Sequence, residues 1–278
     1  MKSECQTALL AGERIDDLQT KGYRIIQNRK LYCFGADAVL LSSYAKLKPD
    51  ERCLDLGSGT GVIPILMCAK NEDNTFRAHK DADCFSKTKS EGGGTKNIRE
   101  GLRFIGLEIQ EELAEMSRRS IILNGLEKEI EIVTGDIITA TETFGNQAFD
   151  VITVNPPYML AGHGIYCKNP SYDIAKHEIK VKLDDILRES AKLLKQGGRF
   201  YMVHRPYRLP EIFSKMVCFG IEPKRMRLVQ SYADSPPTMV LIEGRNGGNR
   251  RLSVEPALIL YEEQGVYTKE ALTFYGDN

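Results

Sequence analysis

Short runs of β-branched and aliphatic residues recur along the chain and alternate with segments of helical periodicity. The runs that predict strands are 52–56, 103–109, 130–134, 149–154, 199–204, 224–230 and 239–243. Apolar residues at helical spacing mark 110–123, before Asn124-Gly125, and 183–194, before Gly197-Gly198. Because strands and helices alternate, the pattern predicts an α/β fold with a doubly wound, mostly parallel sheet of seven strands.

Two segments depart from this alternation. Strands 224–230 and 239–243 are separated by a short segment containing Ser235-Pro236-Pro237, which leaves no room for a crossover helix, so we expect an antiparallel hairpin at the end of the sheet. Segment 71–101 is polar and charged and contains Gly92-Gly93-Gly94, so it is predicted to be a mobile insertion. We therefore expect three parts: an N-terminal extension (1–47), the α/β domain (48–253), and a C-terminal strand and tail (254–278).

The composition adds a few exclusions. The 278 residues carry 38 Lys and Arg against 38 Asp and Glu, so no field of one sign covers the whole chain. We find no uncharged apolar run long enough for a membrane helix and no signal peptide, and we expect a cytoplasmic protein. The seven cysteines and four histidines are scattered without a CxxC pair, which predicts neither a disulfide framework nor a metal site.

A glycine-rich loop follows the first predicted strand of the domain. Residues 54–61 read Leu-Asp-Leu-Gly-Ser-Gly-Thr-Gly and lead into a helix that starts near Val62. A dinucleotide loop would read GxGxxG, but the sixth position here is Val62. Asp55, two residues before Gly57, would repel a pyrophosphate and attract an ammonium group. The loop therefore favours a small cationic ligand over a nicotinamide dinucleotide.

Acidic residues end the next two predicted strands. Glu108 would be the partner of ribose hydroxyls, but its distance from Gly61 exceeds the roughly 20 residues usual in such units. The excess is close to the length of the 71–101 insertion, so the insertion explains it. Asp136 ends the following strand, where an aspartate is more often a cap or a turn residue.

The fourth predicted strand runs into Asn155-Pro156-Pro157-Tyr158, at the edge where open α/β sheets bind ligands. An amino group conjugated to a ring has a delocalised lone pair, so a site that uses this nitrogen must first orient it. The Asn155 side-chain oxygen and the Pro156 carbonyl could accept its two hydrogens. The ring of Pro156 fixes φ, and Tyr158 offers a flat face to a flipped base.

The glycine loop resembles motif I of class I S-adenosylmethionine (SAM) dependent methyltransferases, which have a Rossmann-like fold. The resemblance implies that the loop wraps the methionine end of SAM, that Glu108 accepts the ribose hydroxyls and that Asp136 accepts the adenine amino group. The implied cofactor residues here are Asp55, Gly57, Ser58, Gly59, Gly61, Glu108, Asp136 and Asn155. The Asn155–Tyr158 motif is shared by adenine N6-methyltransferases of DNA and RNA and by release-factor glutamine N5-methyltransferases.

The flanking segments favour one of these substrates. Residues 22–27, 34–41, 175–178 and 265–270 resemble the bacterial tRNA1(Val) adenine-37 N6-methyltransferase family nearly end to end. That resemblance implies methylation of a tRNA anticodon-loop adenine, with Phe34 and Asp37 closing over the cofactor. Asp37 could instead cap the helix that follows it.

Between residues 188 and 251, 13 Lys and Arg stand against 5 Asp and Glu. A surplus of this kind is commonly a solvated face, but with a tRNA substrate it could hold stem phosphates. The candidate contacts are Lys224, Arg225, Arg227, Arg245, Arg250 and Arg251.

Other functions are less compatible with the sequence. A release-factor methyltransferase usually has an N-terminal helical substrate domain, and a DNA methyltransferase needs a target-reading module that 71–101 is too short and polar to form. A nicotinamide oxidoreductase is disfavoured by Val62. A non-catalytic SAM- or nucleotide-binding protein is disfavoured by the intact Asn155–Tyr158 motif.

Overall fold

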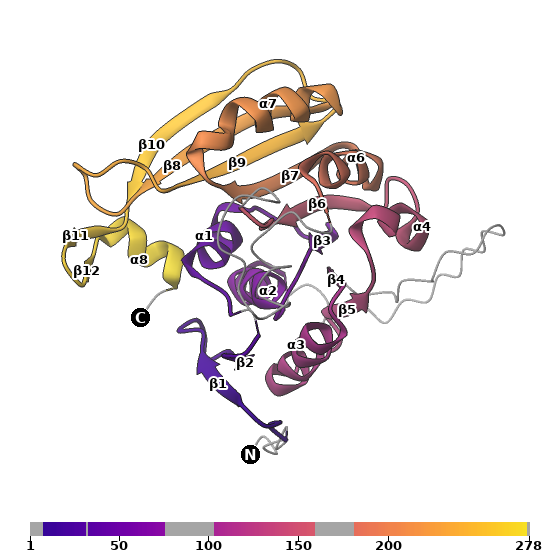
Figure 1. Ribbon diagram of the computed structural model, residues 1–278, viewed down its shortest axis with the longest axis vertical. Coiled ribbons are helices and arrows are strands. Elements are labelled where there is room, and N and C mark those ends of the chain that lie inside the picture. The colour runs from indigo at the N-terminus through magenta and orange to yellow at the C-terminus, as the bar shows by residue number, and fades with distance from the viewer. Residues whose placement is uncertain (1–7, 32, 76–102, 159–180, 277–278) are drawn as a thin grey trace.

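The computed structural model describes residues 8–31, 33–75, 103–158 and 181–276. Its largest element is an eight-stranded sheet in the order β10-β8-β9-β7-β6-β3-β4-β5 (Figure 1). The strands are β3 (Cys53–Leu56), β4 (Phe104–Glu108), β5 (Ile130–Thr134), β6 (Phe149–Val154), β7 (Leu194–His204), β8 (Ile221–Gln230), β9 (Met239–Asn246) and β10 (Ser253–Ile259).

The strand order confirms the predicted doubly wound fold. Strands β3 to β7 are parallel, and the chain moves outward from β3 through β4 to β5, then returns to place β6 on the other side of β3. Strand β9 pairs antiparallel with both β7 and β8, as the short Ser-Pro-Pro connection predicted. The sheet has eight strands rather than seven because the C-terminal strand β10 joins its edge, parallel to β8.

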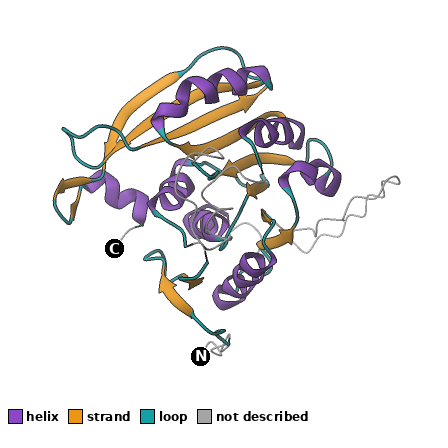
Figure 2. Cartoon of the chain, in the orientation of Figure 1, coloured by secondary structure: helices purple, strands orange, loops and turns teal. Residues whose placement is uncertain are grey.

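Helices cover both faces of the sheet (Figure 2). One face is packed by α1 (Ala36–Tyr44), α2 (Val62–Thr75), α3 (Glu111–Asn124) and α8 (Lys269–Tyr275). The other face is packed by α4 (Ala140–Phe144), α6 (Leu183–Leu193) and α7 (Leu209–Cys218). Short 3-10 turns, η1 (Ile137–Thr139) and η2 (Pro206–Arg208), precede α4 and α7.

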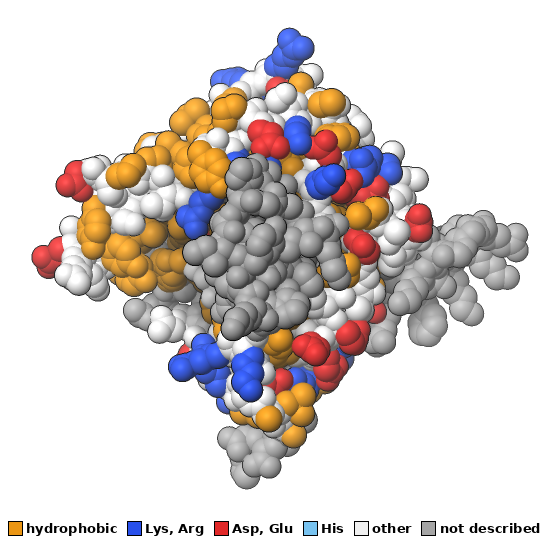
Figure 3. Space-filling model, in the orientation of Figure 1, with side chains coloured by type: hydrophobic (Ala, Val, Ile, Leu, Met, Phe, Trp, Pro, Cys, Tyr) orange, Lys and Arg blue, Asp and Glu red, His pale blue; other side chains and the backbone are white. Residues whose placement is uncertain are grey.

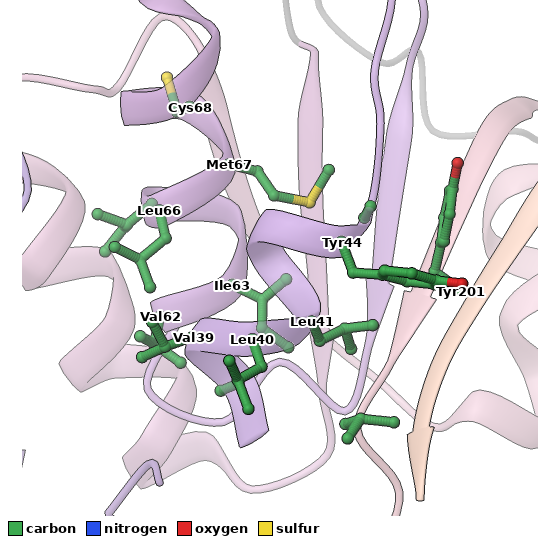
Figure 4. Packing of buried hydrophobic residues seen from close by; sticks show 14 of the residues in the cluster. Val39, Leu40, Leu41, Tyr44, Val62, Ile63, Leu66, Met67, Cys68 and Tyr201 are labelled. Carbon is green, nitrogen blue, oxygen red and sulfur yellow. The ribbon is translucent and has the colours of Figure 1, made fainter. Parts of the chain in front are cut away.

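Helix α1 is apolar around most of its circumference and is correspondingly buried. Val39, Leu40 and Leu41 pack with side chains of α2, and Tyr44 meets the ring of Tyr201 on β7 edge to face at 6.2 Å (Figure 4). This packing fixes the N-terminal end of α1, which carries Asp37, relative to the sheet.

The segment predicted as an N-terminal extension begins with a hairpin of β1 (Glu13–Asp17) and β2 (Arg24–Asn28). The hairpin packs on α3, where the backbone N–H of Ile26 donates to Ser120 Oγ at 3.0 Å and Arg119 pairs with Glu13 at 2.6 Å. A second hairpin, β11 (Tyr261–Glu263) and β12 (Val266–Tyr267), precedes α8. The predicted domain boundaries stay a prediction.

Two predicted features fall on residues that the structure does not describe. Helix α2 extends to Thr75, so the predicted insertion begins later than residue 71, and its remainder lies outside the described residues. The 175–178 stretch also lies outside them. Among the helices that are described, none is both long and apolar enough to cross a membrane.

Candidate active site

Two loops meet where the strand order reverses. The glycine loop follows β3 and the Asn155–Tyr158 motif follows β6, and these strands are direct neighbours, with Leu56 opposite Val154. Ligands of open α/β sheets bind at this position because the loops on either side diverge and leave a crevice. The topology therefore brings together two motifs that lie about a hundred residues apart in the sequence.

The glycine loop is tied to the end of β4. The backbone N–H groups of Gly57 and Ser58 both donate to the carbonyl of Leu107, at 2.9 and 3.0 Å. Gly61 has φ of +79°, and a Cβ added there would lie 2.0 Å from Ser117 Oγ on α3. Only glycine satisfies both the backbone conformation and the close approach to α3.

Asp55 is buried beneath this loop with only 1% of its surface exposed. One oxygen, Oδ1, accepts the Thr153 hydroxyl from β6 at 2.7 Å, whereas Oδ2 has no hydrogen-bond partner among the described residues. Burial raises the pKa of Asp55 to about 7, and the hydrogen bond from Thr153 opposes that rise. A cation placed beside Oδ2 would stabilise the ionised form.

Glu108 ends β4 and shapes the same loop. Its Oε2 accepts the backbone N–H of Gly59 at 2.8 Å, and its Oε1 accepts that of Gln110 at 2.9 Å. Burial raises the pKa of Glu108, and these two backbone hydrogen bonds lower it. Each carboxylate oxygen has a second lone pair, so Glu108 can hold the loop and still accept ligand hydroxyls.

The residues around the loop fit the methionine end of SAM. Ser58 Oγ and Thr60 Oγ1 are buried without hydrogen-bond partners among the described residues, as is Asp55 Oδ2. Buried polar atoms cost free energy unless they are paired, and an amino-acid ligand offers both donors and acceptors for them. Asp55, the loop and Glu108 are the residues that would hold the cofactor.

Two other predicted cofactor residues have local partners. Asp136 Oδ1 accepts the N–H of Ile138 at 3.0 Å and caps η1, which is the capping role weighed for it from the sequence. Phe34 is partly buried against the core, and its backbone N–H donates to Gln27 Oε1 at 3.2 Å. Their contacts to the cofactor stay predictions.

The Asn155–Tyr158 motif meets the N-terminal segment. Tyr158 Oη lies 2.5 Å from Asp37 Oδ2 and 2.7 Å from Asn155 Oδ1. Asp37 lies in the first turn of α1, where its Oδ1 accepts the N–H of Ala38 at 2.9 Å. The structure thus places Asp37 against the Asn155–Tyr158 motif, a contact that the sequence pattern does not reveal.

The end of β7 contributes residues that the sequence analysis missed. The buried ring of His204 meets Tyr158 at 5.3 Å, and the Arg205 guanidinium lies 4.8 Å over the Tyr158 ring. Tyr207 is 71% exposed, and its hydroxyl donates to the Tyr158 carbonyl at 3.1 Å. Burial lowers the pKa of His204 to about 3, so its ring is neutral. The sequence offered one indication of Arg205 and Tyr207: they directly follow a predicted parallel strand, where open α/β sheets bind ligands.

The predicted phosphate contacts lie elsewhere. Arg245 pairs in register with Arg199 on β7, whereas Val240 pairs with His204, so β9 runs away from the carboxyl ends of the parallel strands, where the Asn155–Tyr158 motif lies. Arg250 and Arg251 lie in the connection after β9, and Lys224 lies in the early part of β8. All three therefore lie toward the opposite ends of the strands from the Asn155–Tyr158 motif.

Arg225 and Arg227 have acidic partners within the chain. Arg225 pairs with Glu243 at 2.8 Å and with Glu255 at 3.0 Å, and Arg227 pairs with Glu270 at 2.6 Å. The face of the molecule in Figure 3 likewise shows acidic and basic side chains interspersed rather than a field of one sign. Among the described residues, no group of His, Cys, Asp and Glu could hold a metal ion.

Comparisons with known proteins show which proteins the chain resembles. Residues 37–165 match the family described as an RMKL-like methyltransferase domain. A tRNA1(Val) (adenine(37)-N6)-methyltransferase of Porphyromonas gingivalis is 24% identical over 85% of this chain and 84% of its own. One of Haemophilus influenzae is 24% identical over 90% and 92%. A solved structure described as a predicted O-methyltransferase, from Agrobacterium tumefaciens, shares the fold, with a TM-score of 0.61, 17% identity and coverage of 87% and 98%.

The fold and the comparisons together show a Rossmann-like, SAM-dependent methyltransferase, as the sequence predicted. Within that class, the relatives confirm the predicted resemblance to the bacterial tRNA1(Val) adenine-37 N6-methyltransferases.

Proposed function

We propose that the protein transfers a methyl group from SAM to the N6 amino group of an adenine in tRNA, at position 37 of the anticodon loop. The observation that carries this proposal is the Asn155–Tyr158 motif at the end of β6, beside the glycine loop of β3. The tRNA substrate is the one named for the relatives of both organisms. Such a substrate implies a cytoplasmic reaction.

The chain's own residues orient the amine rather than activate it covalently. The Asn155 side-chain oxygen and the Pro156 carbonyl accept the two amine hydrogens, which turns the nitrogen lone pair toward the methyl donor. When bound, SAM supplies an electrophilic methyl group on a sulfonium. Positioning of this kind contributes up to roughly 7 to 11 kcal/mol in favourable intramolecular reactions. The amine proton leaves afterwards to solvent.

The anticodon loop would approach the catalytic edge, where Arg205 and Tyr207 lie. A single-stranded loop presents unstacked bases, and stacking of a base on an aromatic side chain contributes about 1 to 3 kcal/mol. Tyr207 is the exposed aromatic side chain beside Tyr158, and Arg205 supplies a positive charge at the same rim. The 224–251 basic residues stay predicted contacts for the tRNA stem, away from the target base.

The test uses tRNA isolated from a strain that lacks this gene. The wild-type protein with SAM is expected to form N6-methyladenosine, detected by mass spectrometry of nucleosides and located by nuclease mapping. Asn155→Ala should retain SAM affinity within about threefold and lose methyl transfer by at least a hundredfold. A release-factor fragment and duplex DNA serve as alternative substrates. Methylation of either one in place of tRNA would overturn the proposal, as would full activity of Asn155→Ala.

A further inference from the structure

The hydroxyl of Tyr158 connects the catalytic motif with the N-terminal segment. Its oxygen lies 2.5 Å from Asp37 Oδ2 and 2.7 Å from Asn155 Oδ1, so two acceptor oxygens face one hydroxyl. A tyrosine hydroxyl has one proton, and a carboxylate can only accept. If that proton goes to Asp37, the Asn155 amide must turn over from the orientation in the structure, so that Nδ2 in place of Oδ1 faces Tyr158 and donates to it.

We propose that Asp37 and Tyr158 are positioning residues that set which way the Asn155 amide faces. A side-chain amide exchanges its oxygen and nitrogen by rotation about its last bond, so an outside partner must choose between the two orientations. With Nδ2 turned to Tyr158, Oδ1 is left for the target amine. The opposite orientation would point N–H groups at an amine that itself needs an acceptor. The inference rests on the proposed function and deepens it.

Rigid elements hold both ends of this arrangement. Asp37 lies on α1, whose apolar side chains are buried against α2 and the sheet. The Tyr158 ring lies against His204 and Arg205 at the end of β7. A positioning hydrogen bond is effective only when its anchors do not move, and these anchors belong to the packed fold. The contact of Asp37 with the cofactor that the family resemblance implies stays a prediction, and the role proposed here acts through Tyr158.

The experiment measures kcat, the KM for tRNA and the SAM dissociation constant for Tyr158→Phe, Asp37→Ala and the double variant. Each single change should lower kcat by about 10- to 100-fold, because a misoriented catalytic group costs rates of that order. SAM affinity and KM should stay within about threefold. Because both residues act through one hydrogen-bonded unit, the double variant should lose no more than the worse single variant.

Tyr44→Phe is the matched control. Tyr44 lies on the same helix as Asp37, and its buried hydroxyl has no hydrogen-bond partner among the described residues. The same substitution there should leave kcat unchanged, and thermal melting should show all variants folded. Multiplicative losses in the double variant would overturn the proposal. So would a tenfold weaker SAM affinity in Asp37→Ala with kcat unchanged.

A second readout does not depend on activity. In the ¹⁵N-labelled full chain, one side-chain amide proton of Asn155 should exchange slowly with solvent in the wild type and rapidly in Tyr158→Phe. Asn155→Asp assigns the signal by deleting it. Absence of tRNA methylation by the wild type would defeat the proposed function alone, whereas equal exchange in both proteins would defeat the positioning role.

Discussion

At the scale of single residues, Asp55 couples cofactor binding to stability. Its pKa is raised to about 7 in the folded protein against about 3.9 in an unfolded chain. Between those values the folded state retains a proton that the unfolded state has released, so the free energy of unfolding falls as pH rises from about 4 to 7. Asp55→Asn removes this titration. We expect it to stabilise the protein more at pH 8 than at pH 5, with a difference on the order of 1 to 3 kcal/mol.

Urea unfolding at the two pH values measures this difference. Asp150→Asn, which removes a partly exposed pair with Lys195, is the control and should stay within about 1 kcal/mol of wild type at both. In parallel, Asp55→Asn should weaken SAM binding about tenfold or more at pH 8, since it removes a charge. An equal stability change at pH 5 and pH 8 would contradict the account.

At the scale of elements, the contact between the glycine loop and α3 depends on the absence of a side chain at Gly61. Gly61→Ala would meet Ser117 in addition to the strain of φ +79°, so we expect it to destabilise the protein by about 2 to 4 kcal/mol and to weaken SAM binding. Gly125→Ala is the control because Gly125 has φ +68° with nothing within 4 Å of an added Cβ. It should cost only about 1 to 2 kcal/mol and leave SAM affinity intact. Equal effects of the two variants on both properties would show that steric contact at α3 is unimportant.

At the scale of the whole molecule, variants at two surfaces can show which one binds the RNA. One surface is that of Tyr207, beside the Asn155–Tyr158 motif, and the other is that of Arg250 and Arg251. Tyr207→Ala should raise the KM for tRNA by about 5- to 100-fold, the range expected for one lost stacking contact, with SAM affinity unchanged. Tyr207→Phe retains the ring and should be close to wild type. The pair Arg250→Ala with Arg251→Ala should instead reduce the salt dependence of tRNA binding, by about one unit of slope per phosphate contact. An unchanged KM in Tyr207→Ala would rule out the Tyr207 surface.

Much of the fold was predictable because its signals are local. Strands β5 and β6 begin and end where the β-branched runs predicted, and α3 ends at Gly125 in the left-handed conformation. The two motifs could be placed together because a parallel sheet aligns the carboxyl ends of its strands. The C-terminal strand was also predicted, but its addition to the sheet beside β8 lacked a local signal, because pairing at a sheet edge is decided by what else lies beside it.

The sequence by itself determined the glycine loop and the Asn155–Tyr158 motif, since both follow from short-range patterns. It also determined that they lie on neighbouring strands, because crossover connections between parallel strands are right-handed. Only the tertiary structure decided which partner each polar group has. It paired Arg225 and Arg227 with distant glutamates and brought Asp37 to Tyr158. It also left one oxygen of Asp55 buried with no hydrogen-bond partner in the described parts of the chain. Such contacts depend on the exact positions of the elements relative to one another, and these positions are fixed only when the core packs.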